Sequence, residues 1–293
     1  NPLALAGLEL KSLGNRLQEL FGGRVVHPVN VVPGGVAHRP TQPQLQRLLE
    51  ELQVWSGRWP RLSADFTARA RYPAGCQAVG NFLATGQRSG FSLTGDRLWL
   101  ASGEVLPVSQ YRRLLGEKSS PHSHAKHAAA AGGPFLVGAL ARLKLAEARR
   151  AGPDFMAGPA VIYHNNTAQV EETGWALDRA VQLVEQLAAM APDSPLAVRE
   201  MRPRAGTGTA ACEAPRGLLV HRYVLDDEGR VLDADVVTPT AINQLAMAEQ
   251  IRQDLAEVND AALMPAIVEQ LVRAYDPCIS CATHFLRLNV ERG

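Results

Sequence analysis

The sequence predicts an α+β fold in which helices predominate. Several long stretches place apolar residues three or four positions apart, which is the period of an amphipathic helix. Residues 217–237 instead hold two runs rich in valine and leucine on either side of Asp226-Asp227-Glu228-Gly229, a turn sequence typical of a β-hairpin. Apolar residues make up 46% of the chain and charged residues 20%, proportions typical of a globular chain with a packed core.

The elements follow in chain order. Leucines recur at helical spacing over residues 3–20 with no N-cap signal before them, so we expect this helix to be the middle of a longer segment. Residues 41–71 predict a long helix broken near Pro60, because proline removes a helical hydrogen bond. Residues 90–108 predict a hairpin that turns at Thr94-Gly95-Asp96. Further helices are predicted over residues 134–151, 172–191, 240–258 and 262–275.

The hairpin over residues 217–237 has a consequence for function. Its two strands are antiparallel, so the residue at its entrance and the residue at its exit meet at one end. We therefore expect Arg216 to lie beside Pro239, at an end of the ribbon where a buried metal site could form.

The chemistry is predicted near the C-terminus, in the segment Asp276-Pro277-Cys278-Ile279-Ser280-Cys281-Ala282-Thr283-His284. Two thiolates three residues apart can converge on one soft metal ion, and the histidine can reach the same ion or its surroundings. Three ligands are fewer than the four of a closed structural zinc site. The other cysteines, Cys76 and Cys212, are isolated. On these residues alone the motif is either half of a metal site or a pair of buried structural cysteines.

Composition excludes several classes of function. The net charge of +1 lacks the basic excess of a nucleic-acid-binding protein, so no nucleic-acid partner is predicted. No stretch is long and apolar enough to predict a membrane span, and no secretory signal is readable. Four cysteines without the spacing of a disulfide framework fit a reducing compartment, which predicts a cytoplasmic protein.

The segment 276–284 resembles the C-terminal signature of the large, catalytic subunit of nickel-iron hydrogenases, and in this form it is most similar to their soluble, cofactor-coupled branch. The resemblance continues in the family's order along nearly the whole chain. Its further matches are Gly23 to Asn30 with Pro33-Gly34-Gly35, His122 to Lys126, Val137 to Arg142, Glu213 to Gly217, and Val237 to Thr240 with Asn243.

This resemblance implies a large-subunit-like helical core with β-hairpin insertions, in a single domain over residues 1–293. It also implies reversible heterolytic cleavage of H2 at a nickel-iron centre whose iron carries cyanide and carbon monoxide. Cys278 and Cys281 match two of the four cysteines that hold this centre. The other two belong to an Arg-x-Cys-Gly-x-Cys motif that does not occur in the sequence. We therefore expect the chain to lack the N-terminal portion of the subunit and to be inactive alone.

The resemblance also assigns roles to single residues. Arg216 and Asp276 match catalytic positions, with the guanidinium over the open metal position and the carboxylate as its charge partner. Pro215, Pro239 and Thr240 match the positions that surround the cyanide ligands. His284 and the carbonyl of Val236 match ligands of a magnesium ion. Without the resemblance, Arg216 is more readily a rim residue paired with Glu213 or Asp276, and His284 a surface histidine.

Partners follow from the same resemblance and from cysteine arithmetic. Once Cys278 and Cys281 are assigned, two cysteines remain, which cannot hold an iron-sulfur cluster. An iron-sulfur small subunit is therefore expected, and the leucine-rich face of residues 3–20 is a candidate interface. The family further implies flavin- and nicotinamide- or deazaflavin-linked subunits and nickel-insertion chaperones.

Residues 285–293 resemble the peptide that a maturation endopeptidase removes after the metal is loaded, and the alternative is a permanent C-terminal strand. The alternative function is a redox-inactive scaffold or interaction subunit of a larger electron-transfer complex, as in the related large subunit of respiratory complex I. Those relatives lack the terminal cysteine pair, so Cys278 and Cys281 favour the hydrogenase.

Overall fold

The computed structural model describes residues 2–73, 77–86, 93–120, 123–128, 133–150, 160–191, 194–196, 202–256 and 258–282. Their contacts divide the chain into two compact units. Unit 1 comprises residues 1–71 and 170–203, and unit 2 comprises residues 72–169 and 204–293. The boundary after residue 169 falls inside helix α4 (His164–Ala189). The prediction of one domain over residues 1–293 stays a prediction.

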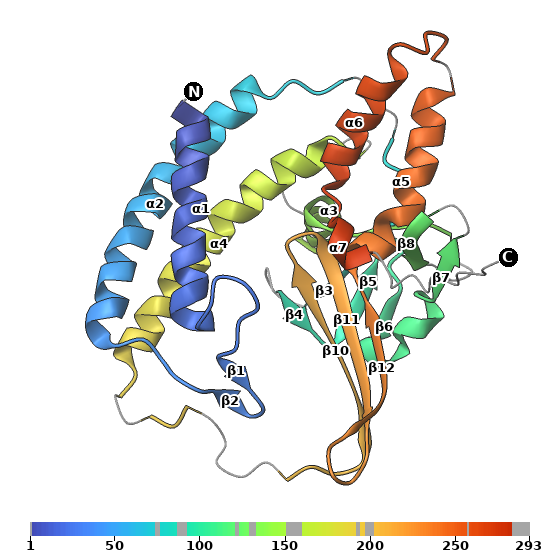
Figure 1. The fold of residues 1–293 in the computed structure, drawn as a ribbon. Coiled ribbons are helices and arrows are strands. Elements are labelled where there is room, and N and C mark those ends of the chain that lie inside the picture. Colours follow the sequence, from blue (N-terminus) through green and yellow to red (C-terminus); the bar gives the residue numbers. More distant parts are fainter. Residues whose placement is uncertain are drawn as a thin grey trace, which may run out of the picture. The chain divides into compact units, whose positions relative to one another are not determined.

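Unit 1 contains helices α1 (Pro2–Gly22) and α2 (Gln42–Arg69), the later part of α4, and a short hairpin of β1 (Val31–Val32) and β2 (Gly35–Val36) (Figure 1). The predicted helix over residues 3–20 is confirmed. Its Leu13 is buried in a cluster with residues of α2 and α4, whereas Leu5 and Leu8 are 62% and 64% exposed. Asn30 fixes the loop before the hairpin, because its side-chain amide donates to the carbonyls of Phe21 and His38.

Helix α2 is unbroken, so the predicted break near Pro60 is wrong. It begins after Thr41, whose side chain forms a capping box with Gln44. Trp55 and Trp59 lie just before the proline and pack into the core cluster of this unit. Trp59 also lies against Gly174, where a Cβ atom would be 2.7 Å from its ring. We attribute the continuity of α2 to this packing, which offsets the hydrogen bond that the proline removes.

In the described part of unit 2, the strands form two four-stranded sheets and a hairpin. The first sheet has the order β12-β11-β10-β4 and the second the order β6-β5-β3-β9. The strands are β3 (Asn81–Gly86), β4 (Thr94–Gly95), β5 (Arg97–Leu100), β6 (Val105–Pro107), β9 (Phe135–Leu136), β10 (Gly206–Ala214), β11 (Gly217–Leu225) and β12 (Val231–Val237). The hairpin is formed by β7 (Glu117–Ser120) and β8 (Ser123–Ala128), and a 3-10 helix, η1, covers Val108–Arg113.

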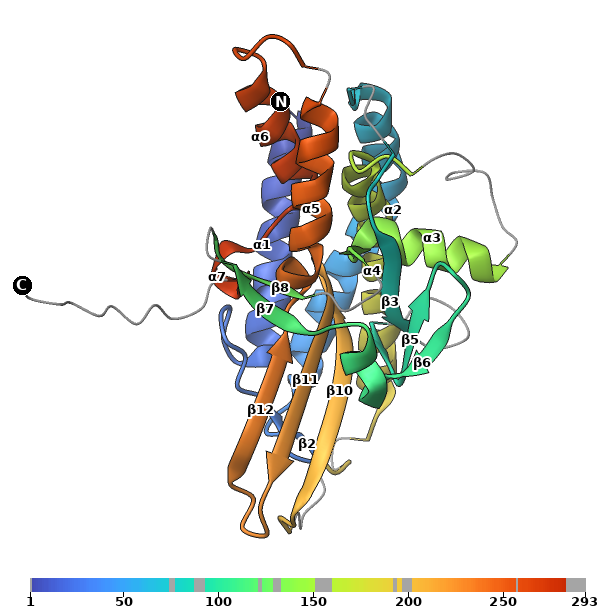
Figure 2. The same ribbon diagram turned by 90° about the vertical axis from the view of Figure 1, so that its right-hand side faces the viewer.

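The predicted hairpin over residues 217–237 is confirmed as β11 and β12, with Val220 opposite Val237. The carboxylate of Asp226 stabilises its turn by accepting the backbone N–H groups of Glu228 and Arg230. Sequence analysis missed β10, which pairs with β11 along its whole length to make a three-stranded ribbon (Figure 2).

The hairpin predicted over residues 90–108 exists among the described residues, but its turn is placed wrongly. β5 and β6 pair with each other, so the turn lies at residues 101–104. Gly95 belongs instead to β4, which pairs with β10. A Cβ atom on Gly95 would lie 2.4 Å from the carbonyl oxygen of Gly86, so this glycine serves a close approach of two backbones and not a turn.

The helices of unit 2 differ from prediction mainly at their starts. Helix α3 (Ala139–Arg150) begins after residue 134, because Phe135 and Leu136 pair with β3 and Gly138 has a φ of +118°. Helix α4 begins at His164 and not at Glu172. Helices α5 (Pro239–Leu255) and α6 (Met264–Tyr275) confirm the predictions over 240–258 and 262–275, and a short α7 (Ile279–Ala282) follows. Among the described helices, none has the length and apolar character needed to cross a membrane.

Gly217→Ala should destabilise the protein more than Gly103→Ala. Both glycines have positive φ, +130° and +86°, so alanine strains the backbone at each. At Gly217 the new Cβ would also lie 2.6 Å from Val137 Cγ2 and 2.7 Å from the backbone nitrogen of Gly138, whereas Gly103 has open space. We expect losses of about 1 kcal/mol for Gly103→Ala and about 3 kcal/mol for Gly217→Ala, measured by urea unfolding. Equal losses would contradict the close packing at Gly217.

Candidate metal centre

The candidate centre begins where helix α6 ends. Leu271, Ala274 and Tyr275 are buried, which anchors the last turn of the helix in the core. Asp276 then adopts the left-handed conformation, with φ 47° and ψ 56°, and its N–H donates to the carbonyl of Val272 at 3.1 Å. Aspartate tolerates this conformation better than most residues. The chain therefore turns sharply at Asp276 and leads directly into the cysteine motif.

Both cysteines of the motif are held at the start of helix α5. The N–H of Cys278 donates to the hydroxyl of Thr240 at 3.0 Å, and the hydroxyl of Thr238 donates to the carbonyl of Cys281 at 3.0 Å. The N–H of Cys281 donates to the carbonyl of Cys278 at 3.1 Å, which closes the turn between them. Thr240 is 5% exposed, so its hydroxyl is a rigid acceptor inside the protein. The backbone thus fixes the two thiols beside each other.

Neither thiol is part of a disulfide, and the two thiols interact electrostatically. The hydrogen bond between them lowers the pKa of Cys278 and raises the pKa of Cys281. The charge of Arg216 acts on both thiols in the same sense, lowering the pKa of each. An adjacent, partly accessible thiol pair fits a soft metal ion such as nickel. Within the described ranges, no three His, Cys, Asp or Glu side chains are grouped as a metal site.

Arg216 lies against the residue that precedes the cysteine motif. Its Nε donates to the backbone carbonyl of Asp276 at 2.7 Å, and a terminal nitrogen donates to Oδ1 of the Asp276 carboxylate at 3.2 Å. Each side chain is 40% exposed. The predicted ion pair between Arg216 and Asp276 is confirmed, and Glu213, the other partner considered, pairs elsewhere.

A buried ion pair positions the turn that carries Arg216. Arg142 and Glu213 meet at 2.7 Å with side chains 6% and 0% exposed. The same guanidinium donates to the carbonyls of Ala214 and Pro215, both at 3.2 Å. The second oxygen of Glu213 accepts the N–H of Thr85 at 2.7 Å. The turn between β10 and β11 is therefore fixed on both sides.

Helix α5 joins the same network through Asn243. Its Oδ1 accepts the N–H of Val137 at 2.8 Å, and its Nδ2 donates to the carbonyl of Val137 at 3.1 Å. Next to it, a Cβ on Gly138 would lie 3.1 Å from the carbonyl oxygen of Arg216. The segments 137–142, 213–217 and 237–243, which are distant in sequence, thus meet in one polar network.

Of the remaining predicted residues, the structure describes some, and others lie outside the described ranges. Pro239 is buried in the first turn of α5, and Val236 lies on β12 opposite His221. His284 lies outside the described residues, so the magnesium site of His284 and Val236 stays a prediction. Cys76 and His122 also lie outside them. Cys212 lies on β10, where burial raises the pKa of its thiol.

The match at His122 to Lys126 falls partly on the β7–β8 hairpin. Lys126 there donates to Glu117 at 2.7 Å, which gives it a structural partner. Sequence analysis missed Asn165 and Gln169, two amides of α4 that reach the end of α6. Their spacing of four residues places them on one helix face, but nothing in the sequence indicates what that face contacts.

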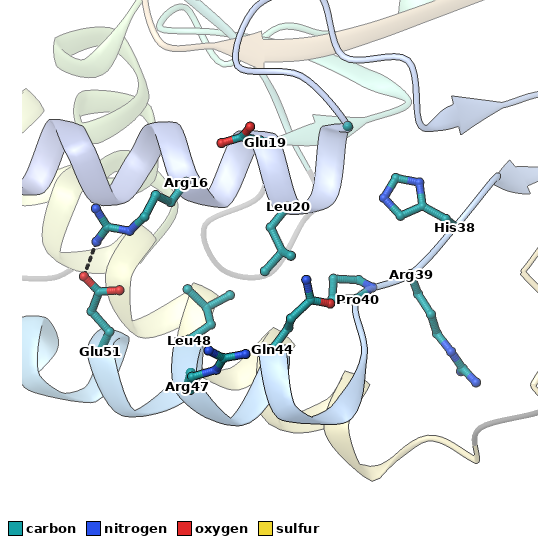
Figure 3. A pocket seen from close by; sticks show the side chains of 11 residues that line it. Arg16, Glu19, Leu20, His38, Arg39, Pro40, Gln44, Arg47, Leu48 and Glu51 are labelled. Carbon is teal, nitrogen blue, oxygen red and sulfur yellow. Dashed lines mark hydrogen bonds and ion pairs between the residues drawn. The ribbon is translucent and has the colours of Figure 1, made fainter.

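Unit 1 holds a separate cavity of about 710 Å³ between the end of α1 and the start of α2 (Figure 3). Arg16 and Glu51 form an ion pair at one side, and Leu20 and Leu48 line its middle. None of its lining residues is a predicted site residue.

Residues 164–284 match the model of the nickel-dependent hydrogenase family. Sulfhydrogenase 1 subunit alpha of Pyrococcus furiosus is 33% identical over 96% of this chain and 67% of its own length. Sulfhydrogenase 2 subunit alpha of the same organism is 34% identical over 98% of this chain and 68% of its own length. The chain belongs to the nickel-dependent hydrogenase large-subunit family.

Solved structures confirm the predicted fold. The structure of an NAD+-reducing NiFe-hydrogenase in the H2-reduced state superposes with a TM-score of 0.77 at 24% identity, covering 97% of this chain and 69% of the other. The reduced, active NiFeSe hydrogenase of Desulfomicrobium baculatum superposes with a TM-score of 0.68 at 20% identity over 97% of this chain. The mainly helical α+β fold is that of a nickel-iron hydrogenase large subunit.

Arg142→Met should destabilise the protein strongly. The substitution leaves Glu213 buried without its cation and removes the donors to the carbonyls of Ala214 and Pro215. Breaking one side of a buried pair costs about 3–5 kcal/mol, which urea unfolding would measure. Arg252→Met, in an exposed pair with Glu249, is the control and should leave the stability unchanged within error. A loss for Arg142→Met no larger than the control's would show that the buried pair is dispensable.

Proposed function

We propose that this chain supplies catalytic residues for the reversible heterolytic cleavage of H2, with the electrons passed to an iron-sulfur small subunit. The observation that carries the proposal is that Arg216 is hydrogen-bonded to Asp276, two residues before Cys278, whose N–H is in turn bound by Thr240. Cys278 and Cys281 would hold a nickel-iron centre from one side, as soft thiolate ligands. When bound, that centre supplies the open coordination position at which dihydrogen is split.

Arg216 contributes a fixed cation. Its Nε and one terminal nitrogen are used on Asp276, and among the described residues its other terminal nitrogen has no partner. A guanidinium held in this way needs no reorganisation to interact with charge that develops beside the thiols. Asp276 keeps the guanidinium in place and balances its charge. Arg216 is thus proposed to polarise the substrate and Asp276 to orient Arg216.

The neighbouring residues would bind the small ligands of the centre. The Thr240 hydroxyl accepts the N–H of Cys278 and still has its own proton to donate, which suits a cyanide ligand. Backbone N–H groups near Pro215 and Pro239 are further donors in this proposal. Carbon monoxide on the iron would lie against apolar side chains. His284 and the carbonyl of Val236 are proposed to bind magnesium.

We infer a multi-subunit assembly, because the two cysteines other than Cys278 and Cys281 cannot hold an iron-sulfur cluster. The P. furiosus relatives are named as alpha subunits. The exposed Leu5 and Leu8 of α1 are candidates for an interface with the small subunit. Flavin- and nicotinamide- or deazaflavin-linked subunits, nickel-insertion chaperones and an endopeptidase that removes residues 285–293 complete the proposed set of partners.

The 293-residue chain alone should not hold a stoichiometric nickel-iron centre. The Cys278–Cys281 pair supplies two thiolates, and no Arg-x-Cys-Gly-x-Cys motif occurs in the sequence to supply two more. Elemental analysis and infrared spectroscopy of the purified chain measure this. Stoichiometric nickel with cyanide and carbonyl bands would refute the expectation. A chain that stays metal-free even in its assembled complex would favour the alternative, a redox-inactive scaffold.

Arg216→Lys should reduce H2 turnover of the assembled hydrogenase on the order of 100-fold while metal content stays normal, as for the loss of a preorganised donor in other enzymes. Lysine keeps the positive charge but loses the planar fork that reaches both the carbonyl and the carboxylate of Asp276. Arg222→Lys, in the ion pair with Asp233 on the ribbon, is the matched control. Near-normal turnover with full metal loading would make Arg216 a structural rim residue.

A further inference from the structure

The start of helix α4 contacts the end of helix α6 through two amide side chains. Asn165, which is 6% exposed, donates from Nδ2 to the carbonyl of Ala274 at 2.8 Å and accepts the N–H of Leu140 at 3.0 Å. Gln169 follows four residues later, on the same face of the helix. Its Nε2 donates to Oδ2 of Asp276 at 3.3 Å. Asn165 thus fixes the helix end, and Gln169 reaches the carboxylate just beyond it.

The carboxylate of Asp276 is held by two donors of different kinds. Oδ1 accepts from the cationic Arg216, and Oδ2 accepts from the neutral Gln169. The ion pair is 40% exposed, and an isolated pair of this exposure is weak and does not fix the plane of the carboxylate. A second donor on the opposite oxygen removes that rotational freedom. Asp276 holds the guanidinium at two points, with its backbone carbonyl on Nε and its carboxylate on a terminal nitrogen, and Gln169 supports the second of these contacts.

We propose that Gln169 is a positioning residue for H2 cleavage: it holds the second oxygen of Asp276 and thereby keeps the Arg216 fork in place beside the thiols. The inference rests on the proposed function, but its structural part concerns contacts within this chain alone. A neutral amide suits the role, because it adds a donor without adding a charge to the Arg216–Asp276 pair. A carboxylate at this position would offer no donor and would repel Asp276.

The first test measures the position of Arg216 in the isolated chain. In Gln169→Leu, hydrogen exchange of the terminal Nη2 protons of Arg216, followed by nitrogen-15 NMR, should become faster, because the carboxylate that accepts from that nitrogen has lost one anchor. Gln182→Leu is the matched control, since Gln182 lies on the same helix and its side chain bonds to the exposed Arg179. Unchanged exchange in Gln169→Leu would overturn the proposal, whether or not the chain belongs to an active enzyme.

The second test measures catalysis in the assembled hydrogenase. Gln169→Leu should lower kcat by about 10-fold or more, as for other residues that orient groups at a metal site, with KM for H2, metal content and infrared bands unchanged. Gln169→Glu keeps the size of the side chain and should lower kcat at least as much, which covers the case that the leucine variant folds poorly. In an Asp276→Asn background the effect of Gln169→Leu should shrink, because its route through the carboxylate is gone.

The outcomes of the two tests separate the two proposals. A wild-type assembly without H2 turnover refutes the proposed function and leaves the exchange experiment to decide the contact. Normal kcat in both Gln169 variants, in an assembly that is active, refutes the positioning role. Equal effects of Gln169→Leu in the wild-type and Asp276→Asn backgrounds would also refute it, because Gln169 would then act by another route.

Discussion

The polar network of unit 2 depends on the ion pair between Arg142 and Glu213. With side chains 6% and 0% exposed, both charges have lost their hydration, and each is acceptable only because the other is present. Both partners of the pair also form other hydrogen bonds. The guanidinium donates to two carbonyls of the β10–β11 turn, and Glu213 accepts the N–H of Thr85. Replacing the pair by apolar residues would preserve packing but would release the turn. The pair therefore serves mainly to position the β10–β11 turn, and its net contribution to the free energy of folding is secondary.

A series of short hydrogen bonds connects this ion pair to the segment that carries the two thiols. The turn carries Arg216, Arg216 holds the carbonyl and carboxylate of Asp276, and Pro277 connects Asp276 to Cys278. On the other side, Thr238, the N-cap of α5, and Thr240 in its first turn bind the backbone of the two cysteines. The thiols thus belong to a segment held from both sides by side chains that are not themselves metal ligands. Such support is what orients the ligands of a metal site.

Local sequence signals predicted part of this arrangement. The turn at residues 226–229 and helices α5 and α6 follow from patterns within their own segments, a turn sequence and helical spacing of apolar residues. Their predictions are confirmed. The break at Pro60, the turn at Gly95 and the start of α3 were misplaced, because tryptophan packing, strand pairing with β10 and strand pairing with β3 decided them. Likewise, the spacing of Cys278 and Cys281 indicates a metal site, and the ion pair between Arg216 and Asp276 could be predicted from the sequence. Arg142, Asn165 and Gln169 could not, because their partners are distant in sequence.

The charges around the thiols explain why the pair is suited to a cation. Arg142 is neutralised by Glu213, and Arg216, whose charge lowers the pKa of both thiols, is itself paired with Asp276. Accordingly, the hydrogen bond between the thiols lowers the pKa of Cys278 at the expense of Cys281, whose pKa it raises. Loss of the second proton places two negative charges side by side, which an adjacent positive charge favours. A soft metal cation supplies that charge and matches the sulfur donors, which couples full deprotonation of the pair to metal binding.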